Sequence, residues 1–193
     1  ENLGKIRSSS HYLLNLISDI LDMSRIENEM MTITSEPFSM GRVADELKSM
    51  MTAEAGRRGL EFVLEDGIKD DILSGDAIRL KQVLMNLISN AFKFTPAGGR
   101  VIVRIRQTGE KEGKAEYNFQ VIDNGEGISE KNQKRIFEAF EQVGTNYSKS
   151  QGTGLGLAIV KEIIQAHDEN IDVVSTEGVG TEFIFSLPKA NLG

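Results

Sequence analysis

The sequence contains no cysteine, and only two of its 193 residues are histidine. The lack of cysteine excludes disulfide scaffolds, zinc ribbons and cysteine nucleophiles. His11 and His167 lie too far apart in the chain to form an HExxH zinc site. No apolar run approaches the ~18 residues of a membrane span, and no signal peptide is visible. We therefore expect a cytoplasmic location and no membrane contact by this piece of chain.

Basic residues are also in deficit, with 22 Lys and Arg against 29 Asp and Glu, a net charge of −7. A nucleic-acid partner held by phosphate neutralisation is therefore disfavoured. The sequence is 39% hydrophobic and 26% charged, which is sufficient for a globular core. A chain of this length predicts one domain with an accessory element.

Residues 1–30 predict one helix, because Leu13, Ile17, Ile20 and Leu21 recur at helical spacing. This apolar stripe must be buried, so we expect a helical hairpin or a second chain to cover it. Packing on its own domain is the alternative. Residues 31–40 predict a linker or edge strand.

The remaining pattern mixes helices and strands. Helices are predicted at 41–58, 76–93, 130–140 and 157–166, and strands at 60–64, 71–75, 101–106, 117–123, 171–175 and 181–187, with a charged hairpin loop at 109–114 and a polar loop at 141–152. Neighbouring strands are joined by hairpins. The predicted fold is therefore an α+β two-layer sandwich, in which helices cover one face of a mixed, largely antiparallel sheet and an extended helix precedes them.

The helix at 76–93 has an unusual polar face, on which Asn86, Asn90 and Lys93 fall within a narrow wedge. A solvated face is one interpretation. However, Asn is a poor interior helix former, and solvated faces are usually built from Glu, Lys and Gln. Amide oxygens can ligate Mg²⁺, and an ammonium group can neutralise phosphate. The face is therefore a candidate ligand site.

Two glycine-containing segments are further candidates. Asp123 ends a predicted strand and is followed by Gly125 and Gly127, which permit close backbone approach to a flat ligand. A plain Asn-Gly turn is the alternative. Residues 152–157 (GTGLGL) lead directly into a helix, where free N–H groups can bind an anion. Neither a GxGxxG dinucleotide fingerprint nor a GxxxxGK[ST] P-loop is present.

Taken together, these segments resemble a known family. Residues 82–95 (QVLMNLISNAFKFT) are similar to the N box, 123–128 (DNGEGI) to the first glycine box, 136–142 (IFEAFEQ) to the F box and 152–157 to the second glycine box of the catalytic domain of bacterial sensor histidine kinases. Residues 180–183 (GTEF) resemble its terminal strand motif. The resemblance implies the Bergerat nucleotide-binding (GHKL) fold over almost the whole chain.

The resemblance also implies cofactors and residue roles. The cofactors are ATP and Mg²⁺, with Asn86 and Asn90 holding the metal, and Asn86 and Lys93 forming the catalytic set. Asp123 would bind the adenine amine with support from Thr181, and residues 141–152 would form a lid whose start is anchored by Phe137 and Phe140. The implied ATP-binding residues are Asn90, Lys93, Asp123, Gly125, Gly127, Ile128, Phe140, Gly152, Thr153, Gly154, Leu155, Gly156, Leu157 and Thr181.

One residue favours phosphoryl transfer over hydrolysis. Related ATPases of this fold place a Glu four residues before the second Asn, and here that position is Asn86, which cannot act as a general base at neutral pH. The expected reaction is transfer of the γ-phosphoryl group to a histidine, followed by relay to an aspartate of a response regulator. A nucleotide-binding module without transfer activity, a GHKL-type ATPase and a serine kinase are the alternatives.

The family resemblance also implies a division of the chain and its partners. Residues 1–30 resemble the second helix of a dimerisation hairpin, 31–40 a linker or edge strand, and 41–193 the catalytic ATP-binding domain. His11 lacks the acidic neighbour and the Arg-Thr-Pro run of an acceptor motif, so we expect the acceptor on a helix outside this sequence. The expected partners are that acceptor helix, a response-regulator receiver domain and a second copy of a homodimeric parent. A membrane-anchored sensor is one form that such a parent can take.

Overall fold

The computed structural model describes residues 2–28, 31–68, 71–111, 114–142 and 152–188. Five strands form the main sheet: β2 (Glu61–Gly67), β4 (Arg100–Lys111), β5 (Lys114–Asp123), β7 (Gly180–Pro188) and β6 (Ile171–Thr176), in that order. The β2–β4 pair is parallel and the other pairs are antiparallel. The prediction of a mixed, largely antiparallel sheet is confirmed.

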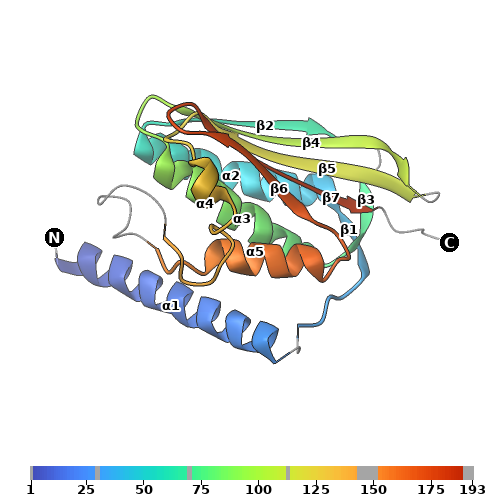
Figure 1. The fold of residues 1–193 in the computed structure, drawn as a ribbon, viewed down its shortest axis with the longest axis horizontal. Helices are drawn as coiled ribbons and strands as arrows, with labels where there is room; N and C mark the ends of the chain where they lie inside the picture. Colours follow the sequence, from blue (N-terminus) through green and yellow to red (C-terminus); the bar gives the residue numbers. More distant parts are fainter. Residues whose placement is uncertain (1, 29–30, 69–70, 112–113, 143–151, 189–193) are drawn as a thin grey trace.

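The long helices lie on one face of this sheet, as Figure 1 shows. They are α2 (Met40–Arg58), α3 (Ala77–Phe94) and α5 (Gly156–Gln165). Alternate residues of β4 such as Val101 and Val103 are fully buried beneath them. The rings of Phe119 on β5 and Phe185 on β7 stack with centroids 4.8 Å apart. The buried core therefore lies between the sheet and the helix layer.

Local sequence signals account for the helix ends near the site. Helix α3 begins after Asp76, whose carboxylate accepts the backbone N–H groups of Ile78 and Arg79 at 3.1 and 3.0 Å. Helix α2 ends at Gly59, which adopts φ 68°. After α5, Asp168 takes φ 60°, a conformation that Asp tolerates better than most side chains. The turn after α5 therefore reaches the left-handed conformation without a glycine.

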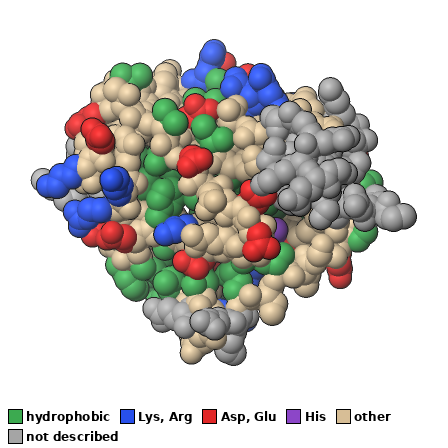
Figure 2. All heavy atoms as spheres, turned by 45° about the vertical axis from the view of Figure 1, so that its right-hand side comes forward, with side chains coloured by type: hydrophobic (Ala, Val, Ile, Leu, Met, Phe, Trp, Pro, Cys, Tyr) green, Lys and Arg blue, Asp and Glu red, His purple; other side chains and the backbone are tan. Residues whose placement is uncertain are grey.

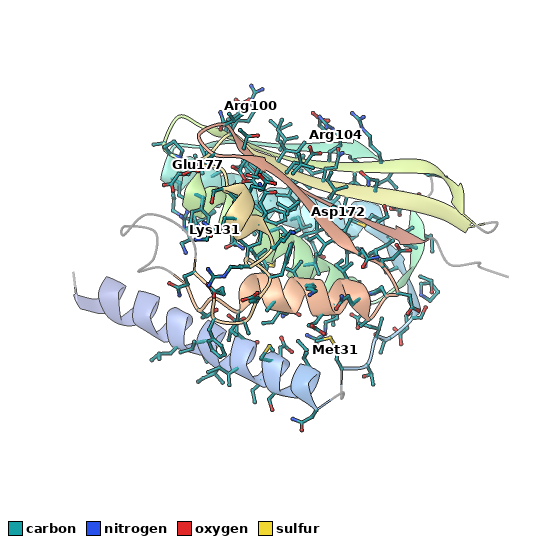
Figure 3. All side chains as sticks on the ribbon, in the orientation of Figure 1. Met31, Arg100, Arg104, Lys131, Asp172 and Glu177 are labelled. Atoms are coloured by element: carbon teal, nitrogen blue, oxygen red, sulfur yellow. The ribbon has the colours of Figure 1, made fainter. Side chains whose placement is uncertain are left out.

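Helix α1 (Asn2–Glu27) lies outside the helix layer, alongside α5 (Figure 1). Its outer face leaves Leu13, Leu14, Ile17, Ile20 and Leu21 half exposed. The chain then runs to β1 (Glu36–Ser39), which pairs with β3 (Ile72–Gly75) in a separate two-stranded sheet. Met31, labelled in Figure 3, packs against the edge of the core in this connection. The apolar stripe predicted from the sequence therefore remains uncovered in a single chain.

Two predicted element boundaries are wrong. The helix predicted at 130–140 is only α4 (Glu130–Gln133), and the chain continues to Phe140 in turns. Phe140 itself takes φ 64°, which no helix allows. The predicted hairpin loop at 109–114 is mostly strand, because β4 continues to Lys111 and β5 begins at Lys114. The backbone pairing between the two strands decides where they end. The run of charged residues at 109–114 carries no information about that pairing.

The opposite face of the sheet is polar. Arg100 and Arg104 project from it, away from the helices, in Figure 3. They form ion pairs of 2.7 and 2.6 Å with Glu61 and Glu65 on the neighbouring strand. On the face drawn in Figure 2, basic and acidic side chains lie near one another in small groups. Among the described residues, no helix is both long and apolar enough to cross a membrane.

Candidate nucleotide-binding site

Helix α3 supplies one wall of the candidate site. Asn86 donates its amide nitrogen to the carbonyl of Gly156 at 3.4 Å, which leaves its amide oxygen free to accept or to ligate. Lys93, one turn beyond Asn90, places its ammonium group 4.7 Å from the ring centroid of Phe94. Partial burial lowers the pKa of the Lys93 ammonium. A bound anion beside this ammonium would stabilise its charged form and so oppose the effect of burial on its pKa.

Asp123, the last residue of β5, supplies a carboxyl group to the candidate site. Its side chain is 9% exposed and accepts the backbone N–H of Gly125 at 2.9 Å. Burial raises the pKa of Asp123 to about 6, although the backbone N–H groups of Gly125 and Thr181 oppose this shift. The carboxylate is therefore poorly solvated and suited to a ligand that offers it a hydrogen-bond donor.

The first glycine segment is tightly attached to the turn between β6 and β7. Gly127 adopts φ 67°, and a Cβ there would lie 2.0 Å from the carbonyl oxygen of Thr176. Glu126 accepts the backbone N–H of Gly178 at 2.7 Å, and Ile128 donates its N–H to the hydroxyl of Ser175 at 2.8 Å. Only glycine permits this approach at position 127. The segment is more than an Asn-Gly turn, since it fixes the backbone beside Asp123.

The second glycine segment, residues 152–157, also borders the candidate site. Gly154 adopts φ 75° and its carbonyl accepts the backbone N–H of Phe140 at 2.9 Å. Leu155 is fully buried in the core, and its N–H donates to the Thr153 hydroxyl at 3.1 Å. Helix α5 starts directly afterwards at Gly156. Most of the predicted lid (residues 141–152) cannot be placed here, because residues 143–151 lie outside the described part of the chain.

These elements enclose one cavity of about 1210 Å³, large enough for a nucleotide. Three sequence-predicted residues do not line it: Gly125, Phe140 and Leu155. The Phe140 ring is 69% exposed, whereas Phe137 packs edge-on against Phe183. The structure brings the other predicted residues together around the cavity: Asn86, Asn90, Lys93, Asp123, Gly127, Ile128, Gly152, Thr153, Gly154, Gly156, Leu157 and Thr181.

Helix α1 also contributes cavity residues that the sequence analysis did not identify, among them Asp19 and Asp22. Asp19 accepts a hydrogen bond from the Thr153 hydroxyl at 3.0 Å. Burial raises the pKa of Asp19, which Thr153 partly opposes. Asp22 is 6% exposed and accepts from Arg79 at 3.0 Å and from Gln82 at 2.7 Å. The spacing of the two acids marks a polar face of α1, but no local signal indicates which surface that face contacts.

The donor set suits magnesium that is bound together with phosphate. Within the described ranges, no three His, Cys, Asp or Glu side chains are grouped to hold a metal on their own. The free amide oxygen of Asn86, with Asn90 one turn away, offers neutral oxygen ligands. Mg²⁺ commonly takes one or two protein oxygens, with water and phosphate oxygens completing its coordination. The residues present therefore fit a metal that enters with a nucleotide.

Comparison with known proteins identifies the family of this chain. Residues 75–191 match the family described as histidine kinase-, DNA gyrase B- and HSP90-like ATPases. The chain is 35% identical over 195 residues to the circadian input-output histidine kinase CikA of Synechococcus elongatus, covering 100% of this chain and 25% of that protein. It is 40% identical over 184 residues to the non-motile and phage-resistance protein of Caulobacter vibrioides, covering 95% and 22%. The chain thus spans about a quarter of the length of these relatives.

Solved structures agree with these sequence matches. Full-length ShkA in complex with AMPPNP superposes with a TM-score of 0.82 at 30% identity, over 98% of this chain and 38% of ShkA. The catalytic domain of histidine kinase ThkA gives a TM-score of 0.68 at 28% identity, over 80% of this chain and 95% of that domain. The chain therefore belongs to the family of histidine kinase-, DNA gyrase B- and HSP90-like ATPases, and its ATPase domain is of the histidine kinase type.

Proposed function

We propose that this chain binds ATP with Mg²⁺ and transfers the γ-phosphoryl group to a histidine of a dimerisation helix, for relay to a response-regulator aspartate. Asp123 receives the adenine amine, and Thr181 lies beside it. Asn90 and Lys93 contact phosphate, and residues 152–157 close over it. Support comes from the shared cavity, which is lined by amide, ammonium, carboxylate and glycine backbone groups from three segments.

The metal is held by Asn86 with Asn90, and Mg²⁺ supplies charge neutralisation for the phosphate oxygens when it is bound. Asn86 is oriented for this role, because its amide nitrogen is engaged by Gly156 and its oxygen is free. Lys93 adds a second positive charge from the next turn of the same helix. The residues of the chain thus position the phosphates and neutralise their charge.

One observation favours phosphoryl transfer over hydrolysis: Asn86 occupies the position at which hydrolases of this fold have a Glu. Because an amide cannot accept a proton from water at neutral pH, the site offers no general base there. An external imidazole supplies its own nucleophilic lone pair and does not require that base. The site can therefore support in-line transfer to a histidine while water attack stays slow.

The uncovered face of α1 supports a dimeric parent. Leu14, Ile17 and Leu21 lie on a helix that contacts the catalytic domain only from its other side. An apolar stripe of this kind fits the first helix of a hairpin and a second copy of the chain. A cytoplasmic location follows from the need for ATP and a receiver domain.

The test is phosphoryl transfer to a separately purified acceptor hairpin of the parent kinase, with γ-labelled ATP. We expect label on the hairpin that is stable to alkali and labile to acid, as phosphohistidine is. An Asn86→Ala variant should bind ATP more weakly in the presence of Mg²⁺ and should not label the hairpin. Acid-stable label would indicate a serine kinase, rapid phosphate release an ATPase, and binding without label a module that lacks transfer activity.

A further inference from the structure

A single hydroxyl group on β6 joins the backbone segments behind Asp123. The Ser175 Oγ accepts the backbone N–H of Ile128 at 2.8 Å and donates to the carbonyl oxygen of Gly180 at 2.8 Å. It also lies 3.0 Å from the Oγ1 of Thr181. Gln133 holds the same region, since its amide nitrogen donates to the carbonyls of Ile128 and Ser175 at 2.9 Å each.

The number of protons available decides the direction of the hydrogen bond between the two hydroxyl groups. A serine hydroxyl has one proton to donate and two lone pairs that accept. A carbonyl oxygen can only accept, so the single proton of Ser175 goes to Gly180. Ile128 occupies one lone pair of Ser175. Thr181 must therefore be the donor in its contact with Ser175, and this contact uses the only hydroxyl proton of Thr181.

The polarity of the cavity follows from this arrangement. Thr181 is 6% exposed and lies directly opposite Asp123 in the β5–β7 pair, so the two side chains project from the same face of the sheet. Both line the cavity. With its proton committed to Ser175, Thr181 offers lone pairs to the cavity beside the Asp123 carboxyl oxygens. This end of the cavity thus presents hydrogen-bond acceptors to a ligand.

We propose that Ser175 is a positioning residue that fixes the hydroxyl orientation of Thr181 and thereby selects a 6-aminopurine nucleotide over a 6-oxopurine nucleotide. The inference rests on the proposed function, because it takes the Asp123 end of the cavity as the base site. An exocyclic amine donates to both acceptors. A 6-oxo oxygen has no proton to donate. It would face the Asp123 and Thr181 oxygens without a hydrogen bond, so the ligand oxygen and the two protein acceptors would all be left unpaired.

Removal of the Ser175 hydroxyl frees the Thr181 proton to rotate toward the cavity. The Thr181 hydroxyl can then donate to a 6-oxo group, and it is no longer held as an acceptor for a 6-amino group. We therefore expect the Ser175→Ala variant to lower the preference for ATP over inosine triphosphate by about tenfold, the scale of one hydrogen bond to an unpaired polar group. A Ser175→Thr variant keeps the hydroxyl and should retain most of the preference.

The experiment is competitive calorimetry with MgATP and magnesium inosine triphosphate, which probe the amino and oxo groups at the same ring position. Ser186→Ala on β7 is the matched control, because this hydroxyl contacts Asn118 on the polar sheet face and does not line the cavity. The ratio of the two dissociation constants is the measured quantity. Loss of packing alone would weaken both nucleotides together and leave the ratio unchanged, and that result would overturn the proposal.

Two further variants separate the possible failures. In a Thr181→Val background, Ser175→Ala should have no additional effect on the ratio, because the proton that Ser175 controls is gone; a further fall in the ratio would contradict the mechanism. Asp123→Asn tests the base site itself. Unchanged ATP binding in that variant would reject the proposed function. Weakened ATP binding there, with an unaltered ratio in Ser175→Ala, would reject only the role of Ser175.

Discussion

Replacing Asp123 with Asn should make the nucleotide-free protein more stable at neutral pH while it weakens nucleotide binding. The Asp123 carboxyl has a pKa of about 6 in the folded chain, compared with 3.8 when it is unperturbed. The folded state therefore holds this proton more tightly than the unfolded state does. The stabilising contribution of the protonated carboxyl is fully present below pH 3.8 and is lost as the pH rises through about 6.

The size of this effect follows from the difference between the two pKa values. About two pKa units at 1.36 kcal/mol each place the destabilisation by the ionised carboxylate at about 3 kcal/mol above pH 7. Asn is neutral at every pH and keeps an oxygen that can accept the N–H of Gly125. The free energy of unfolding should therefore rise by up to about 3 kcal/mol at pH 7.5, or roughly 6–12 °C in Tm. The gain should disappear toward pH 4.

The assay is urea unfolding of wild type and Asp123→Asn between pH 4 and pH 8 without nucleotide. Asp172→Asn is the matched control, since Asp172 is exposed on β6 (Figure 3) and its replacement removes no buried charge. Equal stability of Asp123→Asn and wild type at pH 7.5, or a difference that does not vary with pH, would refute the argument that burial of the charge destabilises the fold.

Binding should change in the opposite direction. A charge-assisted hydrogen bond contributes about 1.5–3 kcal/mol, so MgATP affinity of Asp123→Asn should fall by roughly 10- to 100-fold. For wild type, about one-tenth of the carboxyl groups are ionised at pH 5, which predicts an affinity about tenfold lower than at pH 7.5. The Asn variant should lack this pH dependence. Calorimetry with MgATP at both pH values measures the difference.

Three other substitutions test separate parts of the site. Lys93→Met should weaken MgATP binding by about tenfold or more in calorimetry and leave adenosine binding unchanged, because the ammonium acts on phosphate; an equal loss for both ligands would contradict this role. Asp22→Ala removes the buried acceptor shared by two α3 side chains, at a cost on the order of 3 kcal/mol, and hydrogen exchange of α1 should accelerate. Unchanged exchange would show that this contact does not hold α1. Gly154→Ala should weaken MgATP binding several-fold, because its Cβ would lie 2.9 Å from the Phe140 backbone at φ 75°. Gly98→Ala, with a similar φ of 86°, open space around it and no place in the cavity lining, is the control and should leave binding unchanged.

The order of the elements and the chemical character of the site were predictable from the sequence. Helical and alternating periods located α3 and the paired strands, and Gly59 marked the end of α2 through its own backbone preference. The polar face of α3 identified Asn86, Asn90 and Lys93. These signals are local, because they depend on residues within one or two turns, or on the conformational freedom of a single glycine.

Only the tertiary structure decided the contacts that tune the site. The raised pKa of Asp123 depends on its burial in the folded chain, and the contact of Asp19 with Thr153 joins residues 134 positions apart. The donor role of Thr181 depends on the carbonyl of Gly180 and on the Ser175 hydroxyl of another strand. Solvation and proton direction are properties of an enclosed space, which forms only after distant segments pack together. Periodicity and motif spacing therefore identify the participating residues, whereas packing sets their charge and their hydrogen-bond direction.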